Sequence, residues 1–332
     1  MDDLSEPRNA SYVKKDDFTY VTVNSCFGIV SIFTNLIVLL AFYIKSTKTK
    51  HNKRIIHQYV ISMAVADLTF GAVFVPLAVL SSIGLPYQRE WCLLSIALQI
   101  MTVGFTIMAL VATVEAQFIS IIFPFFYQIR WTSDVANVHI VIHWLFGFLL
   151  GSPILLGYNV EDDTCYFLEI VPKNITLLVV FGMVFPSTVI MIVCYLAIYF
   201  TFIRIMSHRT TDLGILSGKH IILTKSSHLK TSAVIFLNVL LFLICWLPLY
   251  ILDTINVFDS TFTANVHIIN ALLVLRCFRC AINPFLYAYH IPEVKTRFND
   301  VHKWIRCCFC CFKGDSMSRC QSISSQTIVT KL

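Results

Sequence analysis

Seven apolar runs dominate this chain, and each exceeds the ~20 residues that an α-helix needs to cross the hydrocarbon core of a bilayer. The composition agrees, because 57% of the 332 residues are hydrophobic and only 13% are charged, whereas soluble domains carry about a quarter of charged residues. We therefore predict an all-α membrane protein, a seven-transmembrane helix bundle with spans at roughly 18–44, 55–82, 92–123, 135–158, 174–203, 231–256 and 262–290.

Basic residues are distributed unevenly between the two sets of loops, which predicts the orientation of the bundle. On one side, Arg89 and Lys173 are almost the only basic loop residues. The N-terminus should therefore lie outside the cell and the C-terminus in the cytoplasm, as in a multi-pass plasma-membrane protein. This asymmetry also accounts for the net charge of +6, so no nucleic-acid partner is needed. The basic residues of the inner loops are Lys45, Lys48, Lys50, Lys53, Arg54, Arg204, Arg209, Lys219, Lys225 and Lys230.

The segments outside the spans have distinct compositions. An extracellular tail covers 1–17, the bundle covers 18–290, and Pro292 opens a new segment at 291–306. Its apolar residues recur at helical spacing between charged ones, which predicts a short amphipathic helix on the membrane surface. Residues 307–332 form a tail, first cysteine-rich and then Ser/Gln/Thr-rich, which we expect to be disordered and open to receptor kinases and arrestin. The apolar positions of the amphipathic segment are Val294, Phe298, Val301 and Ile305.

Candidate modification sites follow from this topology. Asn9 begins an Asn-Ala-Ser sequon in the outer tail. Cys92 and Cys165 both face the oxidising side, where a disulfide persists. A cysteine cluster follows the last span on the reducing side, beside basic residues, and favours S-palmitoylation; a zinc knuckle is the alternative, although no histidine or second cysteine pair lies at finger spacing. The cluster is Cys307, Cys308, Cys310 and Cys311.

Prolines inside the sixth and seventh spans indicate a bundle that changes shape, because each removes a backbone hydrogen bond and leaves a kink. The two motifs are Cys245-Trp246-Leu247-Pro248 and Asn283-Pro284-Phe285-Leu286-Tyr287. With Asn35, Asp67, Trp144, Pro186 and the Cys92 and Cys165 pair, they form an ordered set across seven spans. This set resembles the rhodopsin-like G-protein-coupled receptors over roughly residues 18–306.

The resemblance implies roles for several residues. Cys92 and Cys165 would form the disulfide that ties the second outer loop to the third span. Ile107, Pro186 and Phe242 match the transmission cluster of that family, and Trp246 matches its rotamer switch. The implied function is a cell-surface receptor that binds a small extracellular ligand and activates a heterotrimeric G protein through movement of the sixth helix about Pro248.

Within that family the chain resembles the adenosine-receptor branch. The shared segments are Ala66-Asp67-Leu68, Val75-Pro76-Leu77-Ala78, Leu155-Leu156-Gly157-Tyr158-Asn159, Cys165-Tyr166-Phe167, Cys245-Trp246-Leu247-Pro248-Leu249 and Asn283-Pro284-Phe285-Leu286-Tyr287-Ala288-Tyr289. Four positions depart from that branch. Asp253 stands in place of its purine-binding asparagine, and Tyr250 stands in place of a histidine. Arg276 and Cys277 stand in place of the Ser-His pair that holds ribose. The pocket residues that we predict are Gln99, Ile100, Val103, Phe167, Trp246, Leu249, Tyr250, Asp253 and Arg276.

Two arginines in the seventh span distinguish this chain. Arg276, Arg279 and Asn283 are spaced by three and four residues, so they line one helix face, and their cost in lipid should turn them into the bundle. We expect Arg279 to pair with Asp67, in a region that holds sodium in relatives, or to reach a polar cavity alone. Arg276 would anchor a carboxylate or phosphate of an anionic ligand, or else make a structural bond to Asp253, Gln99 or a backbone carbonyl.

The inner end of the third span departs from the family as well. Its Asp-Arg-Tyr triplet falls on Ala116-Gln117-Phe118, and Gln117 has no charge with which to meet a G protein. The alternative function is therefore a seven-helix receptor that couples poorly or not at all to G proteins, as a decoy or an arrestin-biased receptor. Glu115 would be a solvated residue near the helix end or a substitute acid.

Other classes of protein are disfavoured. The chain contains no HExxH, GxSxG or phosphate-loop motif, which argues against an enzyme. It also contains no visible internal repeat, which argues against a transporter. We predict no metal site and no cofactor, and we expect His139 and His143 to be packing or lipid-facing residues.

The conformational switch would comprise Asp67, Ile107, Gln117, Pro186, Phe242, Trp246, Pro248, Arg279, Asn283, Pro284 and Tyr287.

Overall fold

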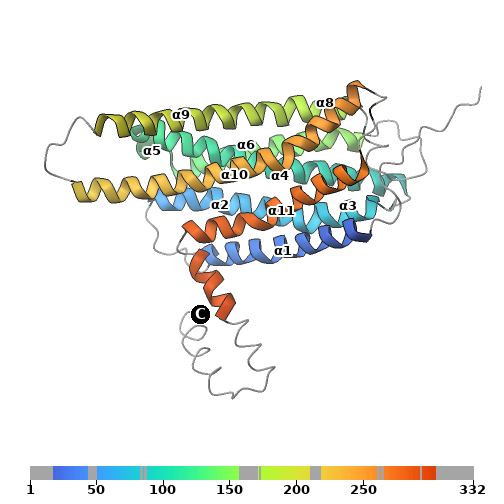
Figure 1. Cartoon of the computed structure of the whole chain (residues 1–332), viewed down its shortest axis with the longest axis horizontal. Coiled ribbons are helices and arrows are strands. Elements are labelled where there is room, and N and C mark those ends of the chain that lie inside the picture. Colours follow the sequence, from blue (N-terminus) through green and yellow to red (C-terminus); the bar gives the residue numbers. More distant parts are fainter. Residues whose placement is uncertain are drawn as a thin grey trace, which may run out of the picture.

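The computed structural model describes residues 18–43, 51–82, 85, 88–156, 171, 173–209, 218–259, 262, 265–291 and 294–303. These residues form helices and no strand, and seven of the helices are long and apolar enough to cross a membrane. The predicted fold class is therefore confirmed. Figure 1 shows the spans lying side by side along the long axis of the molecule. They are Thr19–Tyr43, Ile55–Ser82, Arg89–Ile122, Ser133–Leu155, Lys173–Arg204, Phe236–Phe258 and His267–Ala288.

The helix bounds match the predicted spans closely except near the sixth. The first span is α1 (Phe18–Tyr43), and the second combines α2 (His51–Thr69), the π-helical turn η1 (Phe70–Phe74) and α3 (Val75–Ser82). The third is α4 (Arg89–Ile122), followed by the short α5 (Pro124–Arg130). The sixth, α10 (Gly218–Phe258), has 41 residues instead of the expected 26, so its N-terminal part projects beyond the bilayer core. The remaining elements are α6 (Ser133–Gly151), η2 (Ser152–Leu156), α8 (Lys173–Val179), η3 (Val180–Val184), α9 (Phe185–Arg209) and α11 (Val266–His290).

Two π-helical turns interrupt the second and fifth spans, and each ends two residues before a proline. Pro76 follows η1 and Pro186 follows η3. A proline has no N–H to give to the carbonyl four residues earlier and its ring crowds that carbonyl, so the wider turn accommodates it without ending the helix. The turn in the second span brings Phe70 and Phe74 into a stack with ring centroids 4.4 Å apart.

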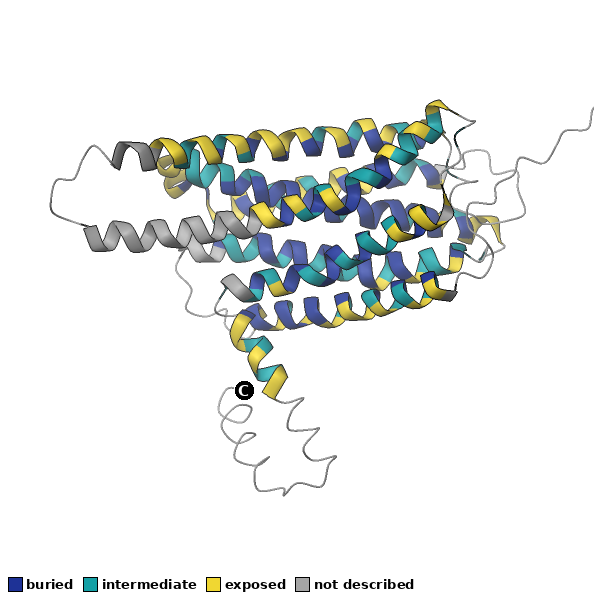
Figure 2. Cartoon of the chain, in the orientation of Figure 1, coloured by how far each residue is buried: buried dark blue, intermediate teal, exposed yellow. Residues whose placement is uncertain are grey.

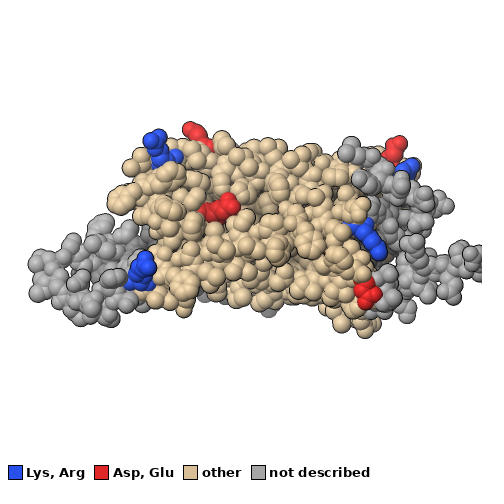
Figure 3. Space-filling model, turned by 90° about the horizontal axis from the view of Figure 1, so that it is seen from above, with Lys and Arg blue, Asp and Glu red and all other residues tan. Residues whose placement is uncertain are grey.

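The outer surface of the bundle is apolar. Large hydrophobic side chains such as Ile29, Phe125 and Phe200 are more than half exposed, and Figure 2 shows buried residues on the inward faces of the helices with exposed ones outside. On the face drawn in Figure 3, the described Lys and Arg side chains lie near the two ends of the bundle. An exposed apolar surface of this extent is expected where lipid replaces water.

The third span, α4, is the central helix of the bundle. It packs against α2, α5, α6, α9 and α10, and most of its residues are buried. Its approach to α6 is very close: a Cβ atom on Gly104 would lie 2.8 Å from the carbonyl oxygen of Gly147, and one on Gly147 would lie 2.9 Å from the carbonyl carbon of Gly104. Small residues at such crossings let membrane helices pack backbone to backbone.

We expect Gly104→Ala to lower the free energy of unfolding by about 1–3 kcal/mol, because the added methyl group must push the α6 backbone away. The measurement is the thermal unfolding midpoint of the purified protein in detergent. Gly182→Ala is the matched control, since a Cβ there meets only Leu178 at an ordinary 3.5 Å. Equal midpoints for the two variants would contradict the close crossing.

A short helix follows the last span. Residues 294–303 are helical and leave the bundle at an angle (Figure 1). Val294 is fully buried against the bundle, and the rings of Phe285 and Phe298 lie 5.3 Å apart. This helix falls within the predicted amphipathic segment at 291–306; the other residues of that segment after 303 lie outside the described part.

Candidate functional site: a buried polar centre below an arginine in an aromatic box

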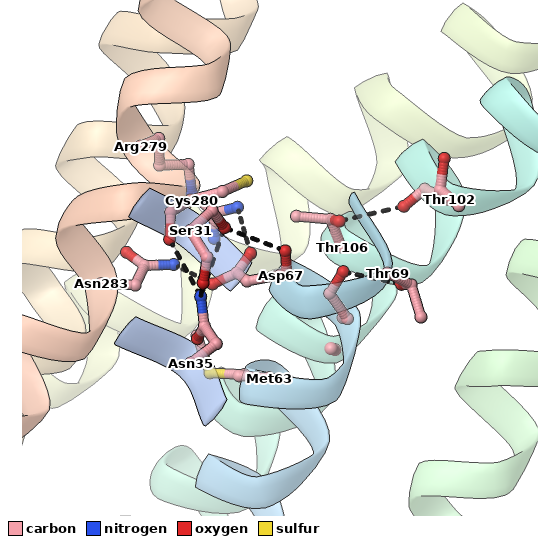
Figure 4. A network of polar contacts seen from close by, with 12 residues as sticks. Ser31, Asn35, Met63, Asp67, Thr69, Thr102, Thr106, Arg279, Cys280 and Asn283 are labelled. Carbon is pink, nitrogen blue, oxygen red and sulfur yellow. Dashed lines mark hydrogen bonds and ion pairs between the residues drawn. The ribbon is translucent and has the colours of Figure 1, made fainter. Parts of the chain in front are cut away.

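The predicted switch residues Asp67, Arg279 and Asn283 meet in the middle of the bundle, as Figure 4 shows. Asp67 is on α2, and the other two are on α11. Asn283 donates a hydrogen bond of 2.6 Å from Nδ2 to Oδ2 of Asp67, while Nη1 of Arg279 lies 3.8 Å from Oδ1 of the same carboxylate. All three side chains are at most 2% exposed, so Arg279 faces Asp67 as expected and does not reach a polar cavity alone.

The α1 helix completes this polar centre. Asn35 donates from Nδ2 to the backbone oxygen of Cys280 at 3.3 Å and to that of Ser31 at 2.9 Å. Ser31 donates to the backbone oxygen of Asp67 at 3.1 Å. Three helices far apart in the sequence are therefore joined by side-chain hydrogen bonds at one level of the bundle (Figure 4). We call Ser31, Asn35, Asp67, Arg279 and Asn283 the polar centre.

The contact of Arg279 is electrostatic and lies beyond hydrogen-bond distance. Its Nε and Nη1 atoms are buried and have no hydrogen-bond partner among the described residues. Buried polar groups are normally satisfied, because leaving one unpaired costs free energy. The contact of Nη1 with Asp67 is therefore held by charge and not by a hydrogen bond.

Arg276 lies one turn away on α11, toward the end where that helix begins, and it contacts aromatic faces. Its guanidinium carbon is 4.5 Å from the ring centroid of Phe74, 5.2 Å from that of Trp246 and 5.9 Å from that of Phe70. Its side chain is 8% exposed. Its buried Nε atom has no hydrogen-bond partner among the described residues, and the choice between an anchor for an anion and a structural bond to Asp253, Gln99 or a backbone carbonyl stays a prediction. We call Phe70, Phe74 and Trp246 the aromatic box.

The aromatic box continues along α10. The Trp246 ring stacks with Phe242 and with Tyr250, each at a centroid distance of 6.1 Å. Trp246 and Phe242 are fully buried, and the indole Nε1 has no hydrogen-bond partner among the described residues. Pro248 lies inside α10 two residues beyond Trp246, and Pro284 lies inside α11 next to Asn283. A kinked helix thus carries the ring that touches Arg276.

The other predicted pocket residues lie on the same helices. Gln99, Ile100 and Val103 are buried on α4, with Nε2 of Gln99 3.4 Å from Oγ of Ser81. Leu249 and Tyr250 are buried on α10, and Asp253, one turn further, is partly buried. Phe167 lies outside the described residues, as do Asn9, Cys165 and the four cysteines at 307–311. Cys92 is disulfide-bonded.

The remaining predicted switch residues are distributed along the bundle. Ile107 is fully buried and Gln117 is 6% exposed, both on α4. Pro186 is partly exposed just after η3. Tyr287 donates from its hydroxyl to Sδ of Met63 at 3.4 Å, below the polar centre. Trp144, from the same ordered set, donates from Nε1 to Oγ of Ser62 at 2.9 Å.

A separate cluster corrects the expectation for two histidines. His139 and His143 on α6 do not simply pack or face lipid, because Nε2 of each lies near Oε2 of Glu115, at 3.0 and 3.2 Å. Glu115 on α4 contacts both rings and so links α4 to α6. These three could hold a metal ion, which the expectation of no metal site overlooked. The signal in the sequence was the i, i+4 spacing of the histidines, which places both rings on one helix face.

Comparisons with known proteins agree with this architecture. Residues 34–287 match the family model described as "7 transmembrane receptor (rhodopsin family)". Adenosine receptor A2b of Gallus gallus is 24% identical, with 93% of this chain and 94% of that protein covered. Adenosine receptor A3 of Ovis aries is 25% identical, with 94% of this chain and 97% of that protein covered. Adenosine receptor A2a of Homo sapiens is also 25% identical, with 85% of this chain and 71% of that protein covered.

Proposed function

Because the chain belongs to the rhodopsin family of seven-transmembrane receptors, we propose that it is a cell-surface receptor that binds a small anionic ligand outside and activates a heterotrimeric G protein inside. Members of this family are receptors and not enzymes, and the relatives named above are adenosine receptors. The chain is accordingly a multi-pass membrane protein of the G-protein-coupled class. The plasma membrane, the outward N-terminus and the identity of the ligand are parts of the proposal.

Arg276 in the aromatic box is the observation that carries the ligand proposal. The guanidinium carbon of Arg276 lies over the rings of Phe74 and Trp246, and an arginine that stacks on aromatic faces can still bind an anion through its N–H edge. That edge binds carboxylate or phosphate bidentately. A neutral nucleoside would leave it unpaired, at a cost of a few kcal/mol. An anion fits the site better than adenosine does.

Binding would reach the inner face through residues already in contact. An anion at Arg276 would draw the guanidinium toward the ligand and change its contact with the Trp246 ring, which stacks on Phe242 of the same kinked helix. Arg279, one turn along α11, is held to Asp67 without a locked hydrogen bond. A ligand that binds one of two packings more tightly shifts the equilibrium between them. We propose that Pro248 is the hinge of that movement.

Gln117 supports a second candidate function, a receptor that couples poorly to G proteins, because a neutral amide stands at this buried position of α4. We expect the wild-type receptor to activate G protein above mock-transfected cells in a ligand-free assay at matched surface expression. Gln117→Arg should then alter the signal only modestly, and Gln117→Asn, which keeps the amide, should match the wild type. A silent wild type beside an active Gln117→Arg variant would favour the poorly coupling receptor instead.

Modification and tail functions follow the same orientation. With the N-terminus outside, Asn9 would be glycosylated and Cys92 would pair with Cys165. With the C-terminus inside, Cys307, Cys308, Cys310 and Cys311 would be palmitoylated next to the helix at 294–303, and the serines beyond them would serve receptor kinases and arrestin. The lipid bilayer is then a partner of that helix as well as of the spans.

A further inference from the structure

The Glu115, His139 and His143 cluster lies between α4 and α6, away from both the aromatic box and the polar centre. His139 and His143 are one turn apart on α6, with ring centroids 4.5 Å apart, and both direct Nε2 at the same carboxylate oxygen, Oε2 of Glu115. One ligand atom from each of the three residues lies within 4.8 Å of the other two. Nothing in the proposed ligand pocket or switch uses these three side chains.

The second nitrogen of each ring is already occupied. Nδ1 of His143 lies 2.9 Å from the backbone oxygen of His139. A carbonyl oxygen can only accept a hydrogen bond, so the Nδ1 atom of His143 carries the proton. Nδ1 of His139 lies 3.1 Å from the hydroxyl of Tyr59 on α2. Such outer contacts fix the tautomer and orientation of metal-ligating histidines. A neutral His143 therefore presents the lone pair of Nε2 to the Glu115 carboxylate.

A lone pair and a carboxylate oxygen 3.2 Å apart repel each other unless His143 is protonated or a cation lies between them. A zinc ion bound tetrahedrally at about 2.0–2.1 Å from each atom would place its ligand atoms roughly 3.3 Å apart. The observed distances from Oε2 of Glu115 to the two Nε2 atoms, 3.0 and 3.2 Å, are close to that value. The helices thus hold Glu115 at nearly the spacing from each histidine that one shared ion requires, and all three ligand atoms lie within 4.8 Å of one another.

We propose that Glu115, His139 and His143 form a binding site for a divalent transition-metal ion, with Zn²⁺ as the best match. Two imidazoles and one carboxylate suit zinc, whereas Ca²⁺ and Mg²⁺ prefer sites built from oxygen alone. Three protein ligands leave a fourth position open. The side chains are 14–27% exposed, so they are not sealed inside the bundle.

Bound zinc would join α4 to α6 near the inner end of the third span. Glu115 is two residues from Gln117 and lies seven residues, or about 10 Å along the helix axis, before the end of α4 at Ile122. His139 lies six residues, about 9 Å, after the start of α6 at Ser133. The ion would restrain the part of α4 that faces the proposed G-protein side, and it would stabilise the folded state, because only folding brings these three ligands together.

Zinc binding by the purified full-length receptor in detergent tests the site directly. We expect isothermal titration to show one zinc equivalent in the wild type that is absent from the triple variant Glu115→Gln, His139→Gln, His143→Gln. Single replacements should each weaken binding at least tenfold, and Tyr59→Phe, which removes only the outer hydroxyl, should weaken it by roughly tenfold. His267→Gln is the matched control, since that histidine is exposed at the start of α11, and it should bind like the wild type.

X-ray absorption at the zinc edge separates this site from the tail cysteines, which are also potential ligands. Zinc on two imidazoles and a carboxylate gives nitrogen and oxygen neighbours at about 2.0–2.1 Å, whereas thiolates give sulfur at about 2.3 Å. Prior treatment with N-ethylmaleimide should leave the first signal intact. Equal zinc binding by wild type and triple variant, or a sulfur-only shell, would overturn the proposal and leave a protonated His143 as the partner of Glu115.

Discussion

Replacing Asp67 with asparagine is expected to lower the free energy of unfolding by about 3–5 kcal/mol, because it leaves the Arg279 charge buried without a counter-charge. The Arg279 side chain is 1% exposed, and among the described residues it forms an ion pair with Asp67. The asparagine keeps the shape of the side chain and can still accept from Asn283, so the loss reports on charge. Thermal unfolding in detergent, followed by tryptophan fluorescence, gives the comparison.

Two further variants make that result specific. The double variant Asp67→Asn, Arg279→Met removes both charges and should be more stable than Asp67→Asn alone, since no uncompensated charge remains. Asp300→Asn breaks a partly exposed pair with Arg297, 3.7 Å long, on the helix at 294–303, and should change stability by less than about 1 kcal/mol. If the double variant is no more stable than the single one, the pairing account is wrong.

Loss of the disulfide at Cys92 should have an effect of similar size. Closing a loop of ~70 residues stabilises a fold by roughly 4 kcal/mol on the chain-entropy model. Cys92→Ser and Cys165→Ser should each reduce surface expression, measured by flow cytometry, and the double variant should be no worse than either single one. Cys26→Ser, which changes an exposed free cysteine, should express normally. Additive losses would show that Cys92 and Cys165 act separately.

The amino-acid sequence carries most of the fold because membrane spans depend on local composition. Runs of apolar residues, each long enough to cross a bilayer, mark all seven helices to within a few residues at most ends. The long α10 is the exception: its first half, from Gly218, is polar enough to look like loop, yet it continues a helix whose later part is apolar. Hydropathy detects the part of a helix in lipid and not the part beyond it.

Side-chain partners were harder to predict because they depend on packing between helices. The spacing of Arg279 and Asn283 indicates that both face inward, and the family resemblance suggests Asp67 as their partner. The aromatic box around Arg276 depends on the π-helical turn at Phe70–Phe74, which has no simple sequence signal before Pro76. Glu115 and its two histidines are 24 and 28 residues apart in the sequence, and only the α4–α6 crossing brings them together.

The most direct test of the central claim is a functional comparison of anionic and neutral ligands on wild-type and Arg276→Gln receptors. Cells expressing each form would be exposed to carboxylic acids and phosphomonoesters beside neutral nucleosides, with G-protein activation as the readout. We expect an anion to activate the wild type and Arg276→Gln to weaken that response at least tenfold, about 1.4 kcal/mol. Arg89→Gln, an exposed basic residue at the start of α4, should respond normally. Activation of the wild type by adenosine at low micromolar concentration, or an unchanged response of Arg276→Gln to the active anion, would contradict the account.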